Sequence, residues 1–285
     1  MFALGLASAL VASALFNIGV ALQAVESKKT PKSLGLRLGL LTRLLQRPVW
    51  LLGLTLGIVG VGPQVLAFAE APFAVVQPAL TAGLLLLIVI GRRRLHESVG
   101  RVTWAGVAGI VAGVGVLAAG VPARVETHRG WLPVISVAVL LAIPSLLPFA
   151  VRATRLDTAW LAVVATGTGF AATNVATKLM SDDVGLRNYP NAVAWALVAL
   201  AMGIAATITN MTAFQRRPAT IVVPVTTAIQ TFLPIVLEPF FLRERWGSAP
   251  LDGAPIAVGI LLAALGTVFV ARARPVAELA AGAAS

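Results

Sequence analysis

The chain has 285 residues, of which 58% are hydrophobic and 12% are charged, and its mean hydropathy is +0.92. A soluble globular domain carries about twice that charged fraction, so the composition excludes an ordinary soluble protein and predicts an all-α, polytopic membrane helix bundle. The lack of cysteine excludes disulfides, thiolate metal sites and cysteine nucleophiles. The net charge of +11 lies in loops beside apolar segments, which favours contact with anionic membrane lipids over nucleic acid.

Apolar runs of about 20 residues recur along the chain, and each can cross a bilayer as a helix. They predict nine spans, at residues 2–24, 49–69, 72–91, 102–121, 131–150, 157–178, 191–214, 218–241 and 252–271. The longest connection, 25–48, is rich in Lys and Arg. Within it, Leu34, Leu38, Leu41 and Leu45 fall on one helical face, which predicts a short helix in the lipid interface; a solvated loop is the alternative.

An internal repeat organises these spans. The pattern Ala-Phe-x-x-x-Pro-x-x-Val-Val-x-Pro at 67–78 returns at 213–224, with Ile in place of the first Val. Span 2 therefore matches span 7 and span 3 matches span 8, and because each pair is five spans apart, the copies are expected to be inverted. The predicted organisation is a first four-helix repeat at 1–121, a connector with the fifth span at 122–156, a second repeat at 157–272 and a short tail at 273–285.

Most of the 22 lysines and arginines lie in one set of alternate loops. The positive-inside rule then places the N-terminus outside and the C-terminus in the cytoplasm of a plasma (inner) membrane. The hairpin at Glu70-Ala71 is expected to face outward, and its repeat mate at Arg216-Arg217 to face inward. The small-residue pairs Gly53/Gly57 and Gly109/Gly113 predict close helix contacts.

Prolines occur at equivalent places in both repeats. Pro78 and Pro224 lie inside their predicted helices, where proline removes the hydrogen bond to the carbonyl four residues earlier. Pro234 likewise frees the carbonyl of Gln230. A freed carbonyl within a membrane must face protein or water, and symmetric broken helices are typical of binding sites at the midplane. Kinks in purely structural helices are the alternative reading.

Amide and hydroxyl side chains form the second group of signals, and Gln64 and Asn210 are equivalent by the repeat. Such groups either join helices or bind a ligand, and their distribution over three repeat-related pairs of spans favours a central polar cavity. The candidate substrate-binding residues are Asn17, Gln64, Gln77, Pro78, Thr81, Asn174, Asn210, Pro224, Thr227 and Gln230.

Ionisable residues within the spans are scarce. Glu238 and Lys178 are candidates for ion coupling, because a charge at this depth is costly. Glu238 could instead pair with Arg243, and Lys178 could reach the interface. His96 and His128 fall in loops on opposite sides and cannot form one metal site. No phosphate-binding loop or G-x-S-x-G motif occurs, so we expect no enzyme activity, no cofactor, no metal site and no ATP-driven pump.

At these residues the chain resembles the drug/metabolite transporter superfamily, whose members are called EamA-like. The A-F-x-x-x-P-x-x-V-V-x-P unit, the Leu-x-Glu helix end and the glycine-rich helix from Gly106 to Gly115 carry the resemblance. The nine-span layout is similar to its NIPA-like branch, which is associated with magnesium transport. That branch has a glycine-glutamate pair where this chain has Gly60-Val61, and asparagine where it has Gln64. Because Mg²⁺ prefers carboxylate oxygens, the substitution favours an organic or amphiphilic substrate.

These observations predict a secondary transporter that alternates access to a midplane site, with membrane lipids and a small-molecule or lipid-like substrate as partners and a homodimer left open. The alternatives are a flippase for a lipid-linked sugar or phospholipid, a NIPA-like divalent-cation transporter and a membrane scaffold without transport. A cavity opening sideways into lipid favours the flippase. Gln64 and Asn210 bonded only to neighbouring helices favour the scaffold.

Overall fold

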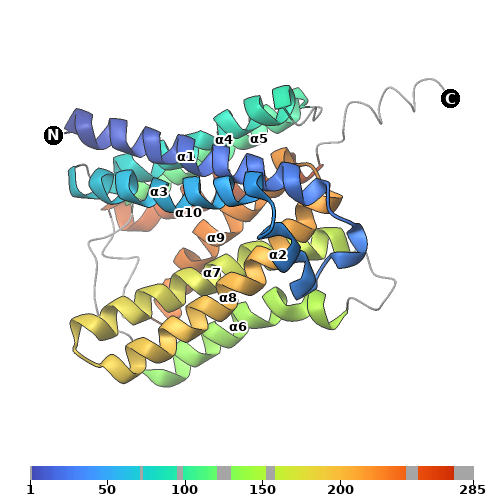
Figure 1. Ribbon diagram of the computed structural model, residues 1–285. Coiled ribbons are helices and arrows are strands. Elements are labelled where there is room, and N and C mark those ends of the chain that lie inside the picture. Colours follow the sequence, from blue (N-terminus) through green and yellow to red (C-terminus); the bar gives the residue numbers. More distant parts are fainter. Residues whose placement is uncertain are drawn as a thin grey trace.

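The computed structural model describes residues 2–70, 73–94, 99–120, 130–151, 158–241 and 250–272. This part of the chain is almost entirely helical and contains no β-strand, which confirms the predicted all-α class. In chain order the elements are α1 (Phe2–Lys28), the 3₁₀ helix η1 (Lys32–Leu34), α2 (Leu38–Leu44), α3 (Pro48–Glu70), α4 (Phe73–Arg94), α5 (Arg101–Gly120), α6 (Trp131–Ala150), α7 (Thr158–Gly185), α8 (Tyr189–Arg216), α9 (Ala219–Phe241), the 3₁₀ helix η3 (Pro250–Gly253) and α10 (Ala254–Arg272) (Figure 1).

The long helices occupy the positions of the nine apolar runs, with two differences. Helix α1 continues to Lys28 and stops just before Pro31, which cannot continue a helix. Helix α7 continues beyond Lys178 to Gly185, and the backbone N–H of Asn188 then donates to the carbonyl of Asp183 at 2.8 Å. The extension beyond Lys178 therefore includes the polar residues Ser181, Asp182 and Asp183.

Length and composition identify four described helices as able to cross a membrane, within α1, α6, α7 and α8. A fifth arises if α2 and α3 count as one span, although their axes differ by 92°. Four further apolar segments, in α4, α5, α9 and α10, have only 10–17 residues. The apolar helices indicate a membrane-embedded protein.

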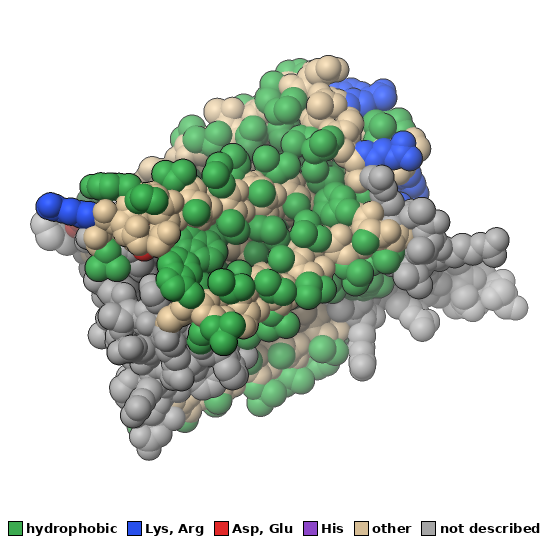
Figure 2. Space-filling model, turned by 90° about the horizontal axis from the view of Figure 1, so that it is seen from below, with side chains coloured by type: hydrophobic (Ala, Val, Ile, Leu, Met, Phe, Trp, Pro, Cys, Tyr) green, Lys and Arg blue, Asp and Glu red, His purple; other side chains and the backbone are tan. Residues whose placement is uncertain are grey.

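A broad apolar surface runs along α6 and α8. Figure 2 shows this face covered mainly by hydrophobic side chains, with Lys and Arg at its edges. Leu132 of α6 is 78% exposed and Leu197 of α8 is 62% exposed. Contiguous apolar area of this kind is rare on soluble monomers and suits contact with lipid. The stacked rings of Trp131 and Trp195, with centroids 6.3 Å apart, also join α6 to α8.

The helices pack in two similar groups. Helix α1 packs against α3 and α4, and α4 packs against α5; in the second group, α7 packs against α8 and α9, and α9 packs against α10. Helices α5 and α10 form the extensive contact between the groups, while α6 packs mainly on α7. Within the two groups the main contacts follow the same pattern, while α6 and the contact of α1 with α8 have no counterpart.

Hydrogen bonds show which helix ends lie together. Near the end of α8, the side-chain amide of Gln215 donates to Thr30 Oγ1, just after α1, at 2.6 Å. The adjacent Arg216 donates to Thr158 at the start of α7. Trp50, at the start of α3, donates to Met211 Sδ of α8 at 3.2 Å. Helices α1 and α8 therefore run toward this end, whereas α3 and α7 run away from it.

We call this end of the bundle the basic end, and it includes Lys29, Arg47 and Arg216. The guanidinium of Arg217, also at this end, lies 4.7 Å from the centre of the Trp160 ring. The opposite end holds Glu70, Asp183 and Arg187. Among the side chains that the structure describes, Arg187 is the one basic group there, so the charge asymmetry expected from the sequence is present in this part of the chain.

Candidate functional site

A cavity of about 430 Å³ lies between the two groups of helices. Its walls come from α1, α3 and α4 of the first group and from α7, α8 and α9 of the second. These helices are the six from which the sequence predicts a binding site. The described lining residues are Phe16, Asn17, Val20, Gln23, Gln64, Leu80, Thr81, Leu84, Phe170, Asn210, Val223, Thr226, Thr227, Gln230 and Thr231.

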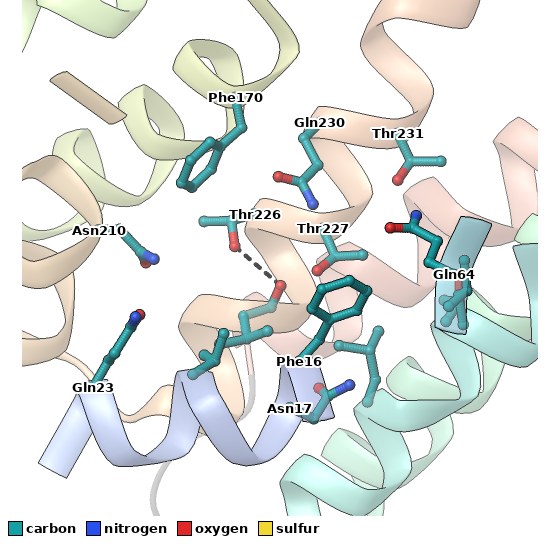
Figure 3. A pocket seen from close by; sticks show the side chains of 15 residues that line it. Phe16, Asn17, Gln23, Gln64, Phe170, Asn210, Thr226, Thr227, Gln230 and Thr231 are labelled. Atoms are coloured by element: carbon teal, nitrogen blue, oxygen red, sulfur yellow. Dashed lines mark hydrogen bonds between the residues drawn. The ribbon is translucent and has the colours of Figure 1, made fainter. Parts of the chain in front are cut away.

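The cavity wall is polar but uncharged. Most of its polar groups are amides and hydroxyls, and none of the described lining residues carries an ionisable side chain. Figure 3 shows the amides of Gln23 and Asn210 turned toward each other on one side, with Gln64 on the other. The rings of Phe16 and Phe170 also border the space. The wall can therefore offer hydrogen bonds and flat apolar surfaces, but no formal charge.

Asn210 and Gln64, which the repeat makes equivalent, both reach the cavity. The buried Asn210 Oδ1 has no hydrogen-bond partner among the described residues. A buried polar atom without a partner is costly, so such atoms are uncommon unless water or a ligand completes them. No hydrogen bond among the described residues commits Asn210 Oδ1 to a neighbouring helix.

Other polar groups in the wall are already engaged. Asn17 Nδ2 donates to the carbonyl of Ser13 at 2.8 Å, and Thr226 Oγ1 donates to the carbonyl of Val223 at 3.0 Å. Each bond lies within a single helix, so it uses one donor without linking two walls of the cavity. The side-chain oxygens of Asn17 and Thr226 keep lone pairs that can still accept hydrogen bonds.

The structure brings together part of the predicted set. Asn17, Gln64, Thr81, Asn210, Thr227 and Gln230 line the cavity. Pro224 lies within α9 but is absent from the wall, as is Asn174 of α7. Asn174 Nδ2 instead approaches the carbonyl of Gln230 at 3.5 Å. This is the carbonyl whose helical partner Pro234 removes, so a side chain of α7 takes the place of the missing backbone donor.

Several predictions fall outside the described residues or side chains. The side chains of Gln77, Pro78, Lys178 and Glu238 are not described, so their roles remain predictions. The same holds for His96, His128 and Arg243, which lie in undescribed segments.

Gln23 is a lining residue that the sequence reasoning missed. It follows Phe16 and Val20 at the spacing i, i+4, i+7, which places all three on one helical face. That spacing was a usable signal. Gln23 lies beside the charged segment that begins at Glu26, where the apolar run ends, so composition alone does not mark it as a lining residue.

Large buried side chains lie between the cavity and the basic end. Along α8 its wall reaches Asn210, and the next residues toward that end, Met211 and Phe214, are fully buried. Trp50 of α3 and Leu40 and Leu44 of α2 are fully buried in the same hydrophobic core. We call these five residues the apolar seal. It separates the cavity from the basic end by a layer of large side chains.

The segment 29–37 crosses from the first group of helices to the second over this seal. Gln215 of α8 holds it through Thr30 Oγ1 at 2.6 Å and the carbonyl of Pro31 at 3.2 Å. Thr212 Oγ1 accepts the backbone N–H of Leu36 at 3.0 Å. Leu36 adopts a positive φ of 57°, which turns the chain into α2. The predicted short helix is present as α2, but it is shorter than expected, and Leu34 belongs to η1 rather than to its face. Its place in the lipid interface stays a prediction.

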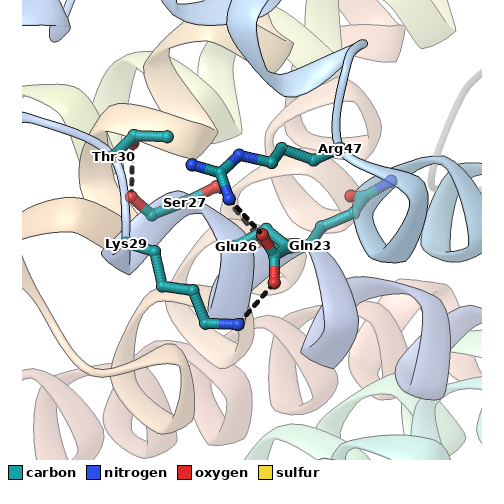
Figure 4. Close-up of polar contacts among 6 residues, drawn as sticks. All are labelled: Gln23, Glu26, Ser27, Lys29, Thr30 and Arg47. Atoms are coloured by element: carbon teal, nitrogen blue, oxygen red, sulfur yellow. Dashed lines mark hydrogen bonds and ion pairs between the residues drawn. The ribbon is translucent and has the colours of Figure 1, made fainter.

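An ion pair fixes the ends of α1 and α3 beside the seal (Figure 4). The Glu26 carboxylate, 4% exposed, lies 2.6 Å from Lys29 Nζ and 3.9 Å from Arg47 Nη1. Arg47 directly precedes α3, so the pair links the two helices across their connection. Glu26 is one helical turn beyond Gln23, but its carboxylate is directed to these cations and does not line the cavity.

No protein-family model, curated protein or solved structure matches the chain. The described residues also contain no group of three or more His, Cys, Asp or Glu side chains that could hold a metal ion.

Proposed function

We propose that this protein is a secondary membrane transporter of the drug/metabolite type, with nine spans in an inverted four-plus-one-plus-four arrangement. It moves a small organic solute by alternating access to the central cavity. The observation that carries the proposal is an uncharged polar cavity at the junction of two groups of helices, with three helices of each group contributing to the described wall. Secondary transporters bind their substrates at such junctions near the middle of the membrane.

The directions of the helices support the inverted arrangement. Helix α1 runs toward the basic end and its match α7 runs away from it, while α3 runs away and its match α8 runs toward it. The main contacts within the two groups also follow the same pattern. A pseudo-two-fold axis in the membrane plane relates two such groups, and the contact between α5 and α10 is where that axis would pass.

The apolar seal supports alternating access. A transporter must close one end of its cavity while the other admits substrate. Here the apolar seal lies toward the basic end, which the positive-inside rule assigns to the cytoplasm. The seal and the segment 29–37 both bridge the two groups of helices, so relative movement of the groups would open them.

The cavity chemistry supports an organic solute over a metal ion. Mg²⁺ prefers several oxygen ligands that include carboxylates, and the described wall contains none. Asn210 and Gln64 both border the cavity, which supports a binding site over a scaffold with a filled core.

Transport by reconstituted protein tests the proposal. Purified protein in liposomes is given a defined mixture of amino acids, nucleobases, sugars and Mg²⁺, with and without a proton gradient, and retained solutes are measured by mass spectrometry and metal analysis. We expect an organic solute to accumulate above protein-free liposomes and the Asn210→Leu/Gln64→Leu variant to lose that accumulation. Thr55→Val, on the exposed face of α3, is the matched control.

Three results would contradict the proposal in different ways. Accumulation of Mg²⁺ without any organic solute would support the alternative of a NIPA-like divalent-cation transporter. Movement of a fluorescent phospholipid between leaflets, in the absence of solute transport, would support the flippase. If the liposomes with protein retained no more solute than protein-free liposomes under any gradient, the result would favour a membrane scaffold without transport.

A further inference from the structure

The cavity wall constrains the charge of its ligand. The described lining residues are all uncharged, and the nearest described carboxylate on α1, Glu26, is already paired with Lys29 and Arg47. A charged molecule in this space would lose its hydration without gaining a counter-ion, which is strongly unfavourable. The described part of the wall therefore favours an electrically neutral ligand.

Asn210 constrains the polar groups of the ligand. Its Oδ1 atom is buried and has no partner within the described part of the chain, although the side chain borders the cavity. A carbonyl oxygen of this kind is completed by an N–H or O–H donor. Figure 3 places the Gln23 amide on the same side of the cavity, so a second polar contact is available beside the first.

The two phenylalanines constrain its shape. Phe16 belongs to α1 and Phe170 to α7, the helices that correspond in the two groups, and both rings border the space. Aromatic side chains contact flat rings favourably in stacked or edge-to-face arrangements. A cavity of about 430 Å³ is near the lower end of the range for small-molecule sites, which suits one ring or two fused rings.

We infer that the cavity binds a small, neutral, planar molecule that donates a hydrogen bond to Asn210 Oδ1 and places its ring against Phe16 and Phe170. This inference rests on the proposed function for the site, since it names the class of solute that the cavity takes. It also distinguishes the cavity from sites for organic cations, organic anions and divalent metals.

Thermal stabilisation of the purified full-length protein tests the ligand class. The neutral probes are nicotinamide, uracil and adenine. Nicotinate is the anionic match to nicotinamide, 1-methylnicotinamide is the cationic match, N,N-diethylnicotinamide lacks the donor, and cyclohexanecarboxamide lacks the planar ring. A ligand present well above its Kd raises the melting temperature of the state that binds it. We expect at least one neutral planar probe to raise it by about 3 °C or more, and its charged, donor-free or non-planar match to raise it by less than about 1 °C.

Substitution of Asn210 tests the contact itself. Asn210→Leu should abolish the shift caused by the neutral probe, whereas Asn191→Leu should preserve it, because Asn191 is on the same helix but does not line the cavity. Asn210→Asp places a carboxylate at the same position and should transfer the shift from the neutral probe to 1-methylnicotinamide. Asn191→Asp adds the same charge outside the cavity and should not. This change of preference is a gain of binding, so loss of folding cannot produce it.

The inference is overturned if no neutral planar probe stabilises the protein. It is also overturned if nicotinate, 1-methylnicotinamide or Mg²⁺ stabilises the unsubstituted protein more than the neutral probes do. A rise in melting temperature that persists in Asn210→Leu would overturn it as well. Its failure differs from failure of the proposed function. Transport of a charged solute would retain the transporter and remove this ligand class, whereas stabilisation by a neutral probe that never crosses the membrane would do the reverse.

Discussion

Gly106 of α5 and Gly266 of α10 meet backbone to backbone at the interface between the two groups of helices. A Cβ atom added to Gly106 would lie 2.7 Å from the carbonyl oxygen of Gly266, and one added to Gly266 would meet the carbonyl oxygen of Gly106 in the same way. Further along, a Cβ at Gly113 would lie 2.7 Å from the carbonyl oxygen of Gly259. The contact is therefore reciprocal, as expected for two equivalent helices beside a two-fold axis.

Because of this glycine contact, we expect alanine to destabilise the protein at Gly106 but not at Gly57. Gly106→Ala should lower the melting temperature, since the new methyl group meets backbone that cannot move without separating α5 from α10; overpacking of this kind costs about 1–3 kcal/mol. Gly57→Ala is the control, because a Cβ there meets nothing within 4 Å and the gain in helix propensity is about 0.5–1 kcal/mol. Thermal unfolding in detergent measures both. Equal melting temperatures for the two variants would contradict the close contact.

The hydrogen bond from the Leu36 N–H to Thr212 Oγ1 should help to hold the segment 29–37 on α8. Thr212→Val keeps the shape of the side chain but removes the acceptor for the Leu36 N–H. A buried donor left without a partner costs about 1–3 kcal/mol, so the melting temperature should fall by several degrees. Thr55→Val is the isosteric control, because Thr55 is exposed and bonds only to its own helix at Leu51. A Thr212→Val protein as stable as the control would show that this bond does not fasten the segment.

The lack of cysteine makes the inverted arrangement testable by labelling. Single cysteines at Glu70 and Arg216 mark the ends of the matched helices α3 and α8. In intact cells, a membrane-impermeant maleimide should label Glu70→Cys, whereas Arg216→Cys should require permeabilised membranes. The unsubstituted chain supplies the blank. If both cysteines were labelled from one side, the repeats would be parallel and the proposed mechanism would fail.

The ion pair at Glu26 predicts a modest loss on neutralisation. Glu26→Gln removes a carboxylate that is 4% exposed, but its partners Lys29 and Arg47 are 57% and 39% exposed and can be rehydrated. The expected cost is therefore about 1 kcal/mol, nearer to a surface pair than to a fully buried one. Glu70→Gln, at the opposite end, has no ion pair within the described residues and should change stability less. Denaturation of both variants at low and high salt provides the measurement.

The positions of the long helices could be predicted from the sequence because each apolar run is long and is bounded by charges, glycine or proline. Nine spans and their inversion stay predictions, since four of the described apolar segments are shorter than the other five. The contacts of single glycines were less predictable. Gly53 does meet Gly19, with a Cβ of Gly19 only 2.5 Å from the Gly53 carbonyl oxygen, yet its sequence partner Gly57 faces open space. A small-residue spacing gives the face of a helix but not its neighbour.

The fold of the segment 29–47 was the hardest part to predict. Two sets of leucines each fit one helical face, and either set could be the buried one: those at 34, 38, 41 and 45, and those at 36, 40 and 44. The structure buries the second set. This choice depends on Trp50 and on Met211 and Phe214, which complete the same core. Met211 and Phe214 lie far away in sequence. The repeat, in contrast, marked Gln64 and Asn210 for the cavity, because equivalence between two copies carries information that one polar residue alone does not.

Met211 gives this protein a built-in chemical reporter. Its thioether accepts the indole N–H of Trp50 and lies 2.9 Å from Ser27 Oγ, with the side chain 1% exposed. Peroxide converts an accessible methionine to its sulfoxide, whereas a sulfur enclosed by three helices is protected. The rate of Met211 oxidation, followed by peptide mass spectrometry, would then report how often the apolar seal opens, without any label attached to the protein.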